Sequence, residues 1–128
     1  MSRHTIVNLK QIEAPEAARA SGVDVHFARS HMGSEHLGIS YFRYPPGVRN
    51  TTGHSHREQE EAYLVIAGSG QIKLDDEVFD IAQWDLVRVA PDVVRALRPG
   101  PDGLEVIAVG SDRPEGGDGT MIRDWWTD

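Results

Sequence analysis

The stretch that decides the fold is EAYLVIAGSGQIKLDDEVFDI, residues 61–81. In it, short runs of aliphatic, β-branched and aromatic residues alternate with Gly, Ser and Asp. Similar runs continue on both sides, and the segments that we expect to form strands are 39–44, 61–67, 71–74, 77–81, 86–90, 93–98 and 104–109. Short strands at regular spacing, separated by turn residues, are typical of an all-β sandwich or barrel. The pattern therefore predicts an all-β chain without βαβ units.

The two ends of the chain are less regular. Residues 14–20 are expected to form a short helix, because a proline suits its first turn and a glycine follows its end. Residues 111–128 resemble a C-terminal tail, in which Trp125 and Trp126 are expected to close over the barrel or over a dimer seam. No linker divides the chain, so we predict one domain with its core at residues 39–110 and a short N-terminal extension.

Composition excludes several classes of protein. The chain has 128 residues, no cysteine, and 13 basic against 20 acidic side chains, which gives a formal charge of −7. Without cysteine there is no disulfide framework, thiolate zinc site or cysteine nucleophile, so any metal must bind His, Asp or Glu. The acidic balance argues against nucleic acid as a partner, because a phosphate backbone needs a basic surface. No apolar stretch reaches the ~20 residues of a membrane span and no signal-peptide core is present, so we expect no membrane partner and a cytoplasmic location.

Residues 47–70 hold the side chains that point to chemistry. His54 and His56 are two apart, so on an extended strand both imidazoles point to the same face. Glu61 begins the next expected strand and shares a face with Tyr63, where a carboxylate is costly unless it is paired or bound to a metal. Two imidazoles and one carboxylate suit a divalent transition metal such as Fe, Mn, Ni or Zn. Alternatively, the two histidines belong to a polar loop without a ligand.

The same residues carry a resemblance to a known family. The order His54-x-His56, four residues, Glu61, six residues, Gly68 matches the first motif of the cupin family. Residues 84–95, WDLVRVAPDVVR, resemble a degraded form of the second cupin motif. The whole chain is similar to small single-domain bacterial cupins of unsettled function in HREQEEAYLVIAGSGQIKLDDEV (56–78), VRVAPDVVRAL (87–97) and the Trp-Trp pair near the C-terminus. The resemblance implies a small antiparallel β-barrel of jelly-roll type, usually paired as a homodimer.

Arg95 is the main departure from the family pattern. It stands where cupins that bind metal through three histidines and a glutamate carry their last histidine. An arginine is effectively always protonated and has no lone pair for a metal, so the expected site has at most three protein ligands. Beside Glu61, the guanidinium would form a charge-assisted pair. Arg95 and a metal ion therefore compete for one carboxylate.

Arg88 is a second cation in this segment. If residues 91–92 form a two-residue connection, Arg88 faces Arg95 across a hairpin, and like charges directly opposite each other are unfavourable. Glu61, an acidic loop residue, or a bound carboxylate or phosphate ligand would relieve the repulsion. Alternatively, the connection is longer, the register differs, and Arg88 lies in solvent.

The resulting hypothesis is a small-molecule enzyme with its site inside the barrel. A divalent metal on His54, His56 and Glu61 would act as a Lewis acid or bind dioxygen or substrate, while Arg95 and Arg88 anchor an anionic substrate.

Two tyrosines complete the expected site. Tyr63 is a candidate proton donor beside Glu61, and Tyr41 is expected either to line the barrel mouth, where it would bind substrate, or to pack. The resemblance implies isomerase, lyase, cyclase or dioxygenase chemistry without choosing among them. One alternative is a metal-free cupin that binds a small anion, or serves as a sensor or accessory protein, with Arg95 neutralising Glu61. Another is a barrel that serves only as a dimerising scaffold.

Overall fold

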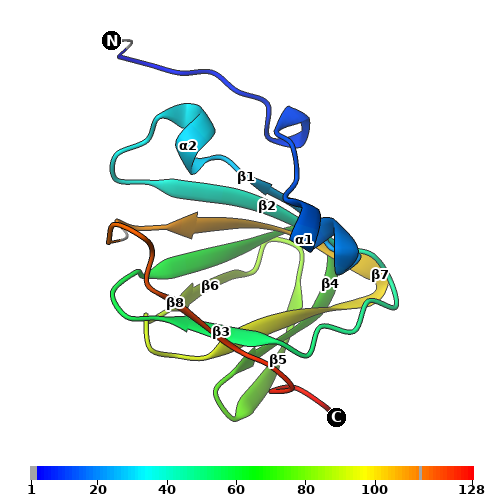
Figure 1. Ribbon diagram of the computed structural model, residues 1–128. Coiled ribbons are helices and arrows are strands. Elements are labelled where there is room, and N and C mark those ends of the chain that lie inside the picture. Colours follow the sequence, from blue (N-terminus) through cyan, green and yellow to red (C-terminus); the bar gives the residue numbers. More distant parts are fainter. Residues whose placement is uncertain (1–2, 113) are drawn as a thin grey trace.

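The computed structural model describes residues 3–112 and 114–128, and the strands of this part of the chain form a curled antiparallel β-structure (Figure 1). Its elements in chain order are η1 (Leu9–Gln11, a 3₁₀ turn), α1 (Glu16–Ala20), β1 (Asp24–Phe27), α2 (Arg29–Met32), β2 (Gly38–Tyr44), β3 (Gly53–His56), β4 (Glu61–Leu74), β5 (Glu77–Ala82), β6 (Leu86–Val89), β7 (Arg95–Gly110) and β8 (Gly119–Ile122). The prediction of an all-β chain with a small barrel is confirmed.

The N-terminal segment holds more structure than the sequence predicts. The helix expected at residues 14–20 begins only at Glu16, because Pro15 keeps an extended backbone as its N-cap. A second short helix, α2, follows β1, and this helix was not predicted. Gly33 ends α2 in the left-handed conformation, with φ of 65°, which favours glycine at a helix C-terminus.

β4 and β7 are each one long strand where the sequence predicts two. Turns are expected at residues 68–70 and 99–103, but the backbone does not reverse at either place. β4 continues with register shifts against β7 at residues 65–67 and 68–70, and its two halves then pair with different strands, β6 and β5. The two predicted turns are therefore wrong, and bends within paired strands replace them.

Gly68 and Gly70 permit the close approach at these bends. A Cβ on Gly68 would lie 2.1 Å from the carbonyl oxygen of Gly103, and one on Gly70 would lie 2.1 Å from that of Arg98. Gly68 also has φ of 74°, a left-handed conformation that side chains rarely adopt. The glycines that resemble turn signals thus mark the place where two bent strands touch.

β7 lies at the centre of the sheet, with β2 on one side and β4 on the other. Residues directly opposite one another in antiparallel strands point to the same face. Two such rows face the interior of the barrel: Glu61, Gly110 and Gly38 form the first, and Tyr63, Ala108 and Ser40 form the second. The core behind them is built from aliphatic and aromatic side chains with almost no exposed surface, including Val65, Val106, Leu104, Ile72 and Val89.

Residues 111–128, predicted as a tail, complete the fold instead. β8 pairs with β3 along its whole length and lies beside it in Figure 1. Trp126 is 2% exposed, and the Arg98 guanidinium lies 4.0 Å from the centre of its ring. The sequence did not predict β8, because a polar, glycine-rich segment can join a sheet edge through backbone hydrogen bonds alone, without an apolar pattern.

The outer face of the sheet carries apolar side chains. Leu86 is 68% exposed and Val109 is 40% exposed, and Leu64 lies between their strands. The homodimer stays a prediction, and sedimentation analysis tests it by measuring the mass of the protein in solution. Among the described residues, no helix combines the length and the apolar character that crossing a membrane requires.

Candidate metal centre

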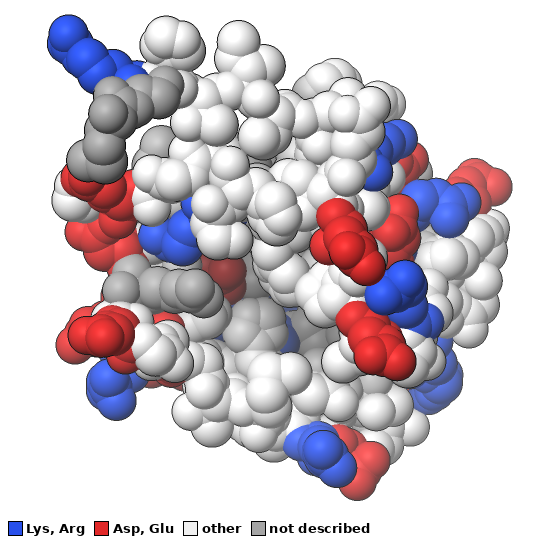
Figure 2. Space-filling model, turned by 45° about the horizontal axis from the view of Figure 1, so that its top comes forward, with Lys and Arg blue, Asp and Glu red and all other residues white. Residues whose placement is uncertain are grey.

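A cavity of about 410 Å³ opens on the inner side of the barrel. Its walls include the apolar side chains of Phe42, Tyr44 and Leu97. Figure 2 shows a hollow near the centre of one face, surrounded mostly by uncharged atoms. A largely apolar cavity of this size with a few converging polar groups is the usual form of a small-molecule site.

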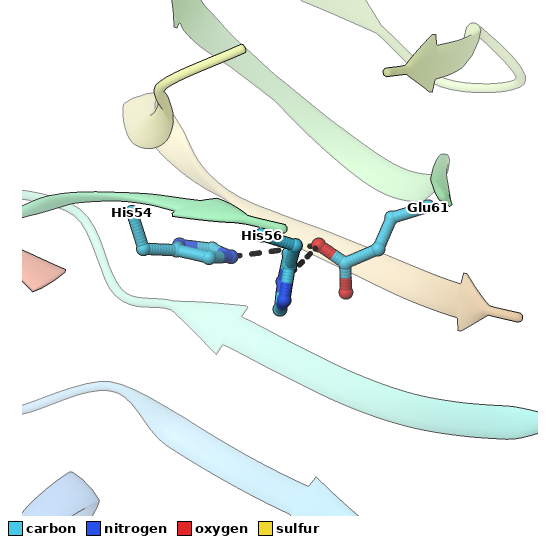
Figure 3. Close-up of side chains that lie close together, drawn as sticks. All are labelled: His54, His56 and Glu61. Carbon is cyan, nitrogen blue, oxygen red and sulfur yellow. Dashed lines mark hydrogen bonds and ion pairs between the residues drawn. The ribbon is translucent and has the colours of Figure 1, made fainter. Parts of the chain in front are cut away.

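Three of the predicted residues meet at this cavity. The Nε2 atoms of His54 and His56 lie 3.4 Å and 3.2 Å from the same oxygen, Oε1 of Glu61. In Figure 3 both imidazoles project from β3, and the carboxylate points toward them from the start of β4. One ligand atom from each residue lies within 4.8 Å of the other two. The structure thus brings the three expected ligands together.

The three donors fit a divalent metal ion. Ligand atoms bonded to one such ion at about 2.1 Å lie roughly 3–3.5 Å apart, and both His–Glu distances fall in this range. The Nδ1 atom of His56 lies 2.9 Å from Oδ1 of Asp118, so the proton on Nδ1 is directed to that carboxylate. Nε2 is then the nitrogen left for a metal, and this arrangement is frequent around histidine ligands. The set of His54, His56 and Glu61 can therefore hold a metal.

Asp118 is a site residue that the sequence did not reveal. Its Oδ2 accepts hydrogen bonds from the backbone N–H groups of Glu58, at 2.7 Å, and Gln59, at 2.8 Å. Although burial alone would raise its pKa, these two bonds and His56 hold the pKa of Asp118 at about 2. The residue lies 62 positions from His56 in a polar segment, and no motif links the two. Only the pairing of β8 with β3 brings them together.

Tyr63 and Glu61 are held in opposite protonation states at neutral pH. Burial alone would raise the pKa of Glu61, but hydrogen bonds from His54 and Tyr63 and the two nearby imidazoles lower it to about 2. The Tyr63 hydroxyl donates to Oε1 of Glu61 at 2.8 Å. Burial, and then the charge of Glu61, raise the pKa of Tyr63 well above its ordinary value. An ionised carboxylate therefore stands beside a phenol that keeps its proton.

Arg95 lies behind the three ligands, with none of its surface exposed. Its backbone pairs with His54, and its Nε lies 3.7 Å from Oε1 of Glu61, too far for a hydrogen bond. Its Nη atoms donate to the backbone carbonyls of His54, Ala90 and Pro91 at 3.3–3.5 Å. Arg95 therefore accompanies Glu61 as expected, but it does not line the cavity, so its position gives a ligand no access to the guanidinium.

Arg88 does not face Arg95, and the structure agrees with the alternative of a longer connection with Arg88 in solvent. β6 pairs with β4, where Arg88 lies opposite Ala62, whereas Arg95 begins β7 beside His54. The Arg88 side chain is 70% exposed and pairs with Glu60 at 2.6 Å, outside the cavity. The residues after β6 form a turn rather than a two-residue connection between paired strands, so no hairpin register links the two arginines.

Tyr41 also lies away from the cavity. It is 2% exposed on the outer side of β2, where it stacks against His26 and its hydroxyl donates to Glu105. Of its two expected placements, packing is therefore the one that the structure shows, and Phe42 and Tyr44 of the same strand line the cavity instead. The N-terminal segment covers the outer face of β2 here, with Lys10 over the Tyr41 ring. Tyr41 is therefore buried although it lies outside the barrel.

Comparison with known proteins identifies the fold of this chain. No family model matches the sequence and no curated protein matches it. Among solved structures, a cupin protein from Bacteroides fragilis is similar over 88% of this chain and 86% of its own, with a TM-score of 0.72 and 20% identity. A sugar phosphate isomerase of the cupin superfamily from Silicibacter pomeroyi is similar over 93% and 92%, with a TM-score of 0.69 and 17% identity.

A third structure holds a ligand. It is a variant of the Streptomyces protein PAC13 with uridine, similar over 91% of this chain and 89% of its own, with a TM-score of 0.72 and 15% identity. At these identities the likeness concerns the fold. The fold that the sequence motifs implied is confirmed: this chain has the double-stranded β-barrel fold of the cupin superfamily.

Proposed function

We propose that this protein is a metal-dependent enzyme that converts a small molecule inside the barrel. The observation that carries the proposal is the convergence of His54, His56 and Glu61 on one point of the cavity wall, with Asp118 orienting His56. A bound divalent ion, Fe, Mn, Ni or Zn, would supply Lewis-acid chemistry to a substrate oxygen.

The residues around the ligands have separate tasks in this proposal. Tyr63 holds a proton at its hydroxyl oxygen, directed at Glu61, and is the candidate proton donor. Arg95 balances the charge of Glu61 and fixes the backbone of β3, so its role is to position the ligands. Phe42 and Leu97 exclude water from the wall of the cavity. The isomerase among the structural neighbours supports small-molecule conversion, and isomerase, lyase, cyclase and dioxygenase chemistry all fit.

One observation favours a second candidate, a metal-free protein that binds a small anion as a sensor or accessory subunit. The Arg95 guanidinium carries a fixed positive charge 3.7 Å from the Glu61 carboxylate, and no solvent reaches it. A buried cation at this place balances the negative charge of the carboxylate without a metal ion.

Metal analysis separates the two candidates. Protein purified without a histidine tag and equilibrated with Zn²⁺, Mn²⁺ or Fe²⁺ is expected to retain about one ion per chain for at least one of these metals, because three oriented donors suffice for a site. His54→Ala is expected to lose that ion. His36→Ala is the matched control, since His36 is 75% exposed, pairs with Asp112 and does not line the cavity. Native protein that retains no metal under any of these conditions would rule out the enzyme proposed here.

A further inference from the structure

Two glycines face each other across the strands at one end of the cavity. Gly38 of β2 lies directly opposite Gly110 of β7, and both line the cavity. Gly110 also lies opposite Glu61, so the three residues form one row that points into the barrel. With strands about 4.8 Å apart, the Cα atoms of Glu61 and Gly38 are separated by roughly 10 Å. The glycine pair is thus a patch of wall without side chains, two strands from the candidate metal centre.

Polar side chains fill the space that the glycine pair leaves open. A Cβ on Gly38 would lie 2.5 Å from Nη2 of Arg29, and one on Gly110 would lie 2.3 Å from Nε2 of Gln59. Both nitrogens donate to the backbone carbonyl of Ser111, Arg29 at 2.7 Å and Gln59 at 3.1 Å. A guanidinium and an amide are therefore held side by side over the glycines, by one shared acceptor.

Arg29 is the arginine that the cavity presents to a ligand. It lines the cavity and is half-buried, whereas Arg88 is exposed outside and Arg95 is sealed behind the wall. In residues 3–112 and 114–128 no ion pair joins Arg29 to a carboxylate, and its bond to Ser111 uses one of the five N–H groups of a guanidinium. The cavity wall thus carries a fixed positive charge that the described carboxylates leave unbalanced.

We propose that Arg29, with Gln59 beside it, binds a carboxylate group of the substrate over the glycine pair. A guanidinium binds a carboxylate through two parallel hydrogen bonds, and one cation balances one anion. A phosphate would bring about −1.5 to −2 charges to a wall that already carries Glu61, and one arginine would not balance them. The cavity is lined by Phe27 and Phe42 near this end, which suits an apolar body.

This inference rests on the proposed function, because it names the class of its substrate: a small carboxylic acid with a short spacer between the carboxylate and the reacting atom. Arg29 takes the role of anion anchor that the sequence hypothesis gave to Arg88 and Arg95. The sequence did not point to Arg29, since it lies outside both motifs on a helix, α2, that was not predicted.

The test compares two probes of equal shape, benzoate and neutral benzamide, by following backbone NMR shifts of metal-free protein at constant ionic strength. Native protein is expected to bind benzoate at least about tenfold more tightly than benzamide, as for a hydrogen bond to a charged group. Arg29→Gln is expected to remove this preference. Gly38→Ala should remove it too, because the added methyl displaces the flexible guanidinium without meeting backbone. Arg88→Gln is the matched control and should keep the preference.

Three results would overturn the inference. They are equal binding of benzoate and benzamide to native protein, a preference that survives in Arg29→Gln, and tighter binding of phenyl phosphate than of benzoate. Metal retention is measured on separate samples of the same variants, equilibrated with metal as described above. Native protein that retains no metal but still prefers benzoate contradicts the proposed enzyme and leaves the carboxylate site standing. Native protein that retains metal but binds benzoate and benzamide equally contradicts only the carboxylate site.

Discussion

Arg95→Met is expected to lower the free energy of unfolding by about 3 kcal/mol, measured by urea denaturation in the presence of a chelator. The guanidinium is completely buried, and it binds three backbone carbonyls that join β3 to the turn before β7. Methionine fills a similar volume but removes all three of these hydrogen bonds and also the cation nearest to Glu61. Arg88→Met is the control and should cost less than about 1 kcal/mol, because Arg88 is mostly exposed.

The same substitution should change metal affinity in the opposite direction. A fixed cation near the carboxylate repels a divalent ion, so its removal is expected to raise affinity by about tenfold or more. Arg95→His removes the charge and also supplies an imidazole at the position where metal-binding cupins carry one. We therefore expect it to bind metal more tightly than Arg95→Met, in a competition assay with a fluorescent chelator. Equal affinity in the native protein and both variants would contradict the assignment of Arg95 to the fourth ligand position.

Asp118→Asn is expected to weaken metal binding by about 10–100-fold with a smaller effect on folding. The side-chain oxygen of asparagine can still accept from the backbone N–H groups of Glu58 and Gln59. Its NH₂ group then faces Nδ1 of His56, which must accept a hydrogen bond, so the ring proton moves to Nε2 and blocks the metal-binding nitrogen. Histidine ¹⁵N NMR reports this change of tautomer directly.

Asp118→Ala separates the two tasks of this carboxylate. It leaves two N–H groups without an acceptor, so the free energy of unfolding should fall by about 2–4 kcal/mol in addition to the loss of metal affinity. Asp112→Asn is the matched control, since Asp112 makes the same contact with His36, at 2.9 Å, on the surface. Native-like metal affinity in Asp118→Asn would show that Asp118 has only a structural role.

The sequence was sufficient for the ligand set because the relevant spacing is local. His54 and His56 lie two apart on one strand, so strand periodicity predicts their common face. Glu61 opens the next strand after a short loop, and the resemblance to the first cupin motif is what joined it to the two histidines. The same periodicity correctly placed Tyr63 beside Glu61. Family resemblance added the closed barrel, which local patterns do not specify.

Long-range pairing decided what the sequence could not show. Arg29 lines the cavity from α2, and Asp118 contacts His56 from the position just before β8; neither element has a strong local signal in the sequence. Tyr41 packs, which was one of its two expected placements. The sequence could not choose between them because both faces of β2 are covered, one by the barrel interior and one by the N-terminal segment. The turn predicted at residues 68–70 was wrong because glycine is favoured both where the chain reverses and where two strands approach closely.

The two contacts made by residues 111 and 118 also set the order in which the site can form during synthesis. Arg29 leaves the ribosome first, followed by His54, His56 and Glu61. Ser111, which holds Arg29 and Gln59, and Asp118, which orients His56, follow about fifty residues later. A nascent chain that ends before residue 111 contains the three candidate metal ligands. It lacks Ser111 and Asp118, the two residues that orient the side chains of the site. The emerging barrel is therefore unable to assemble a finished site until β8 has been made.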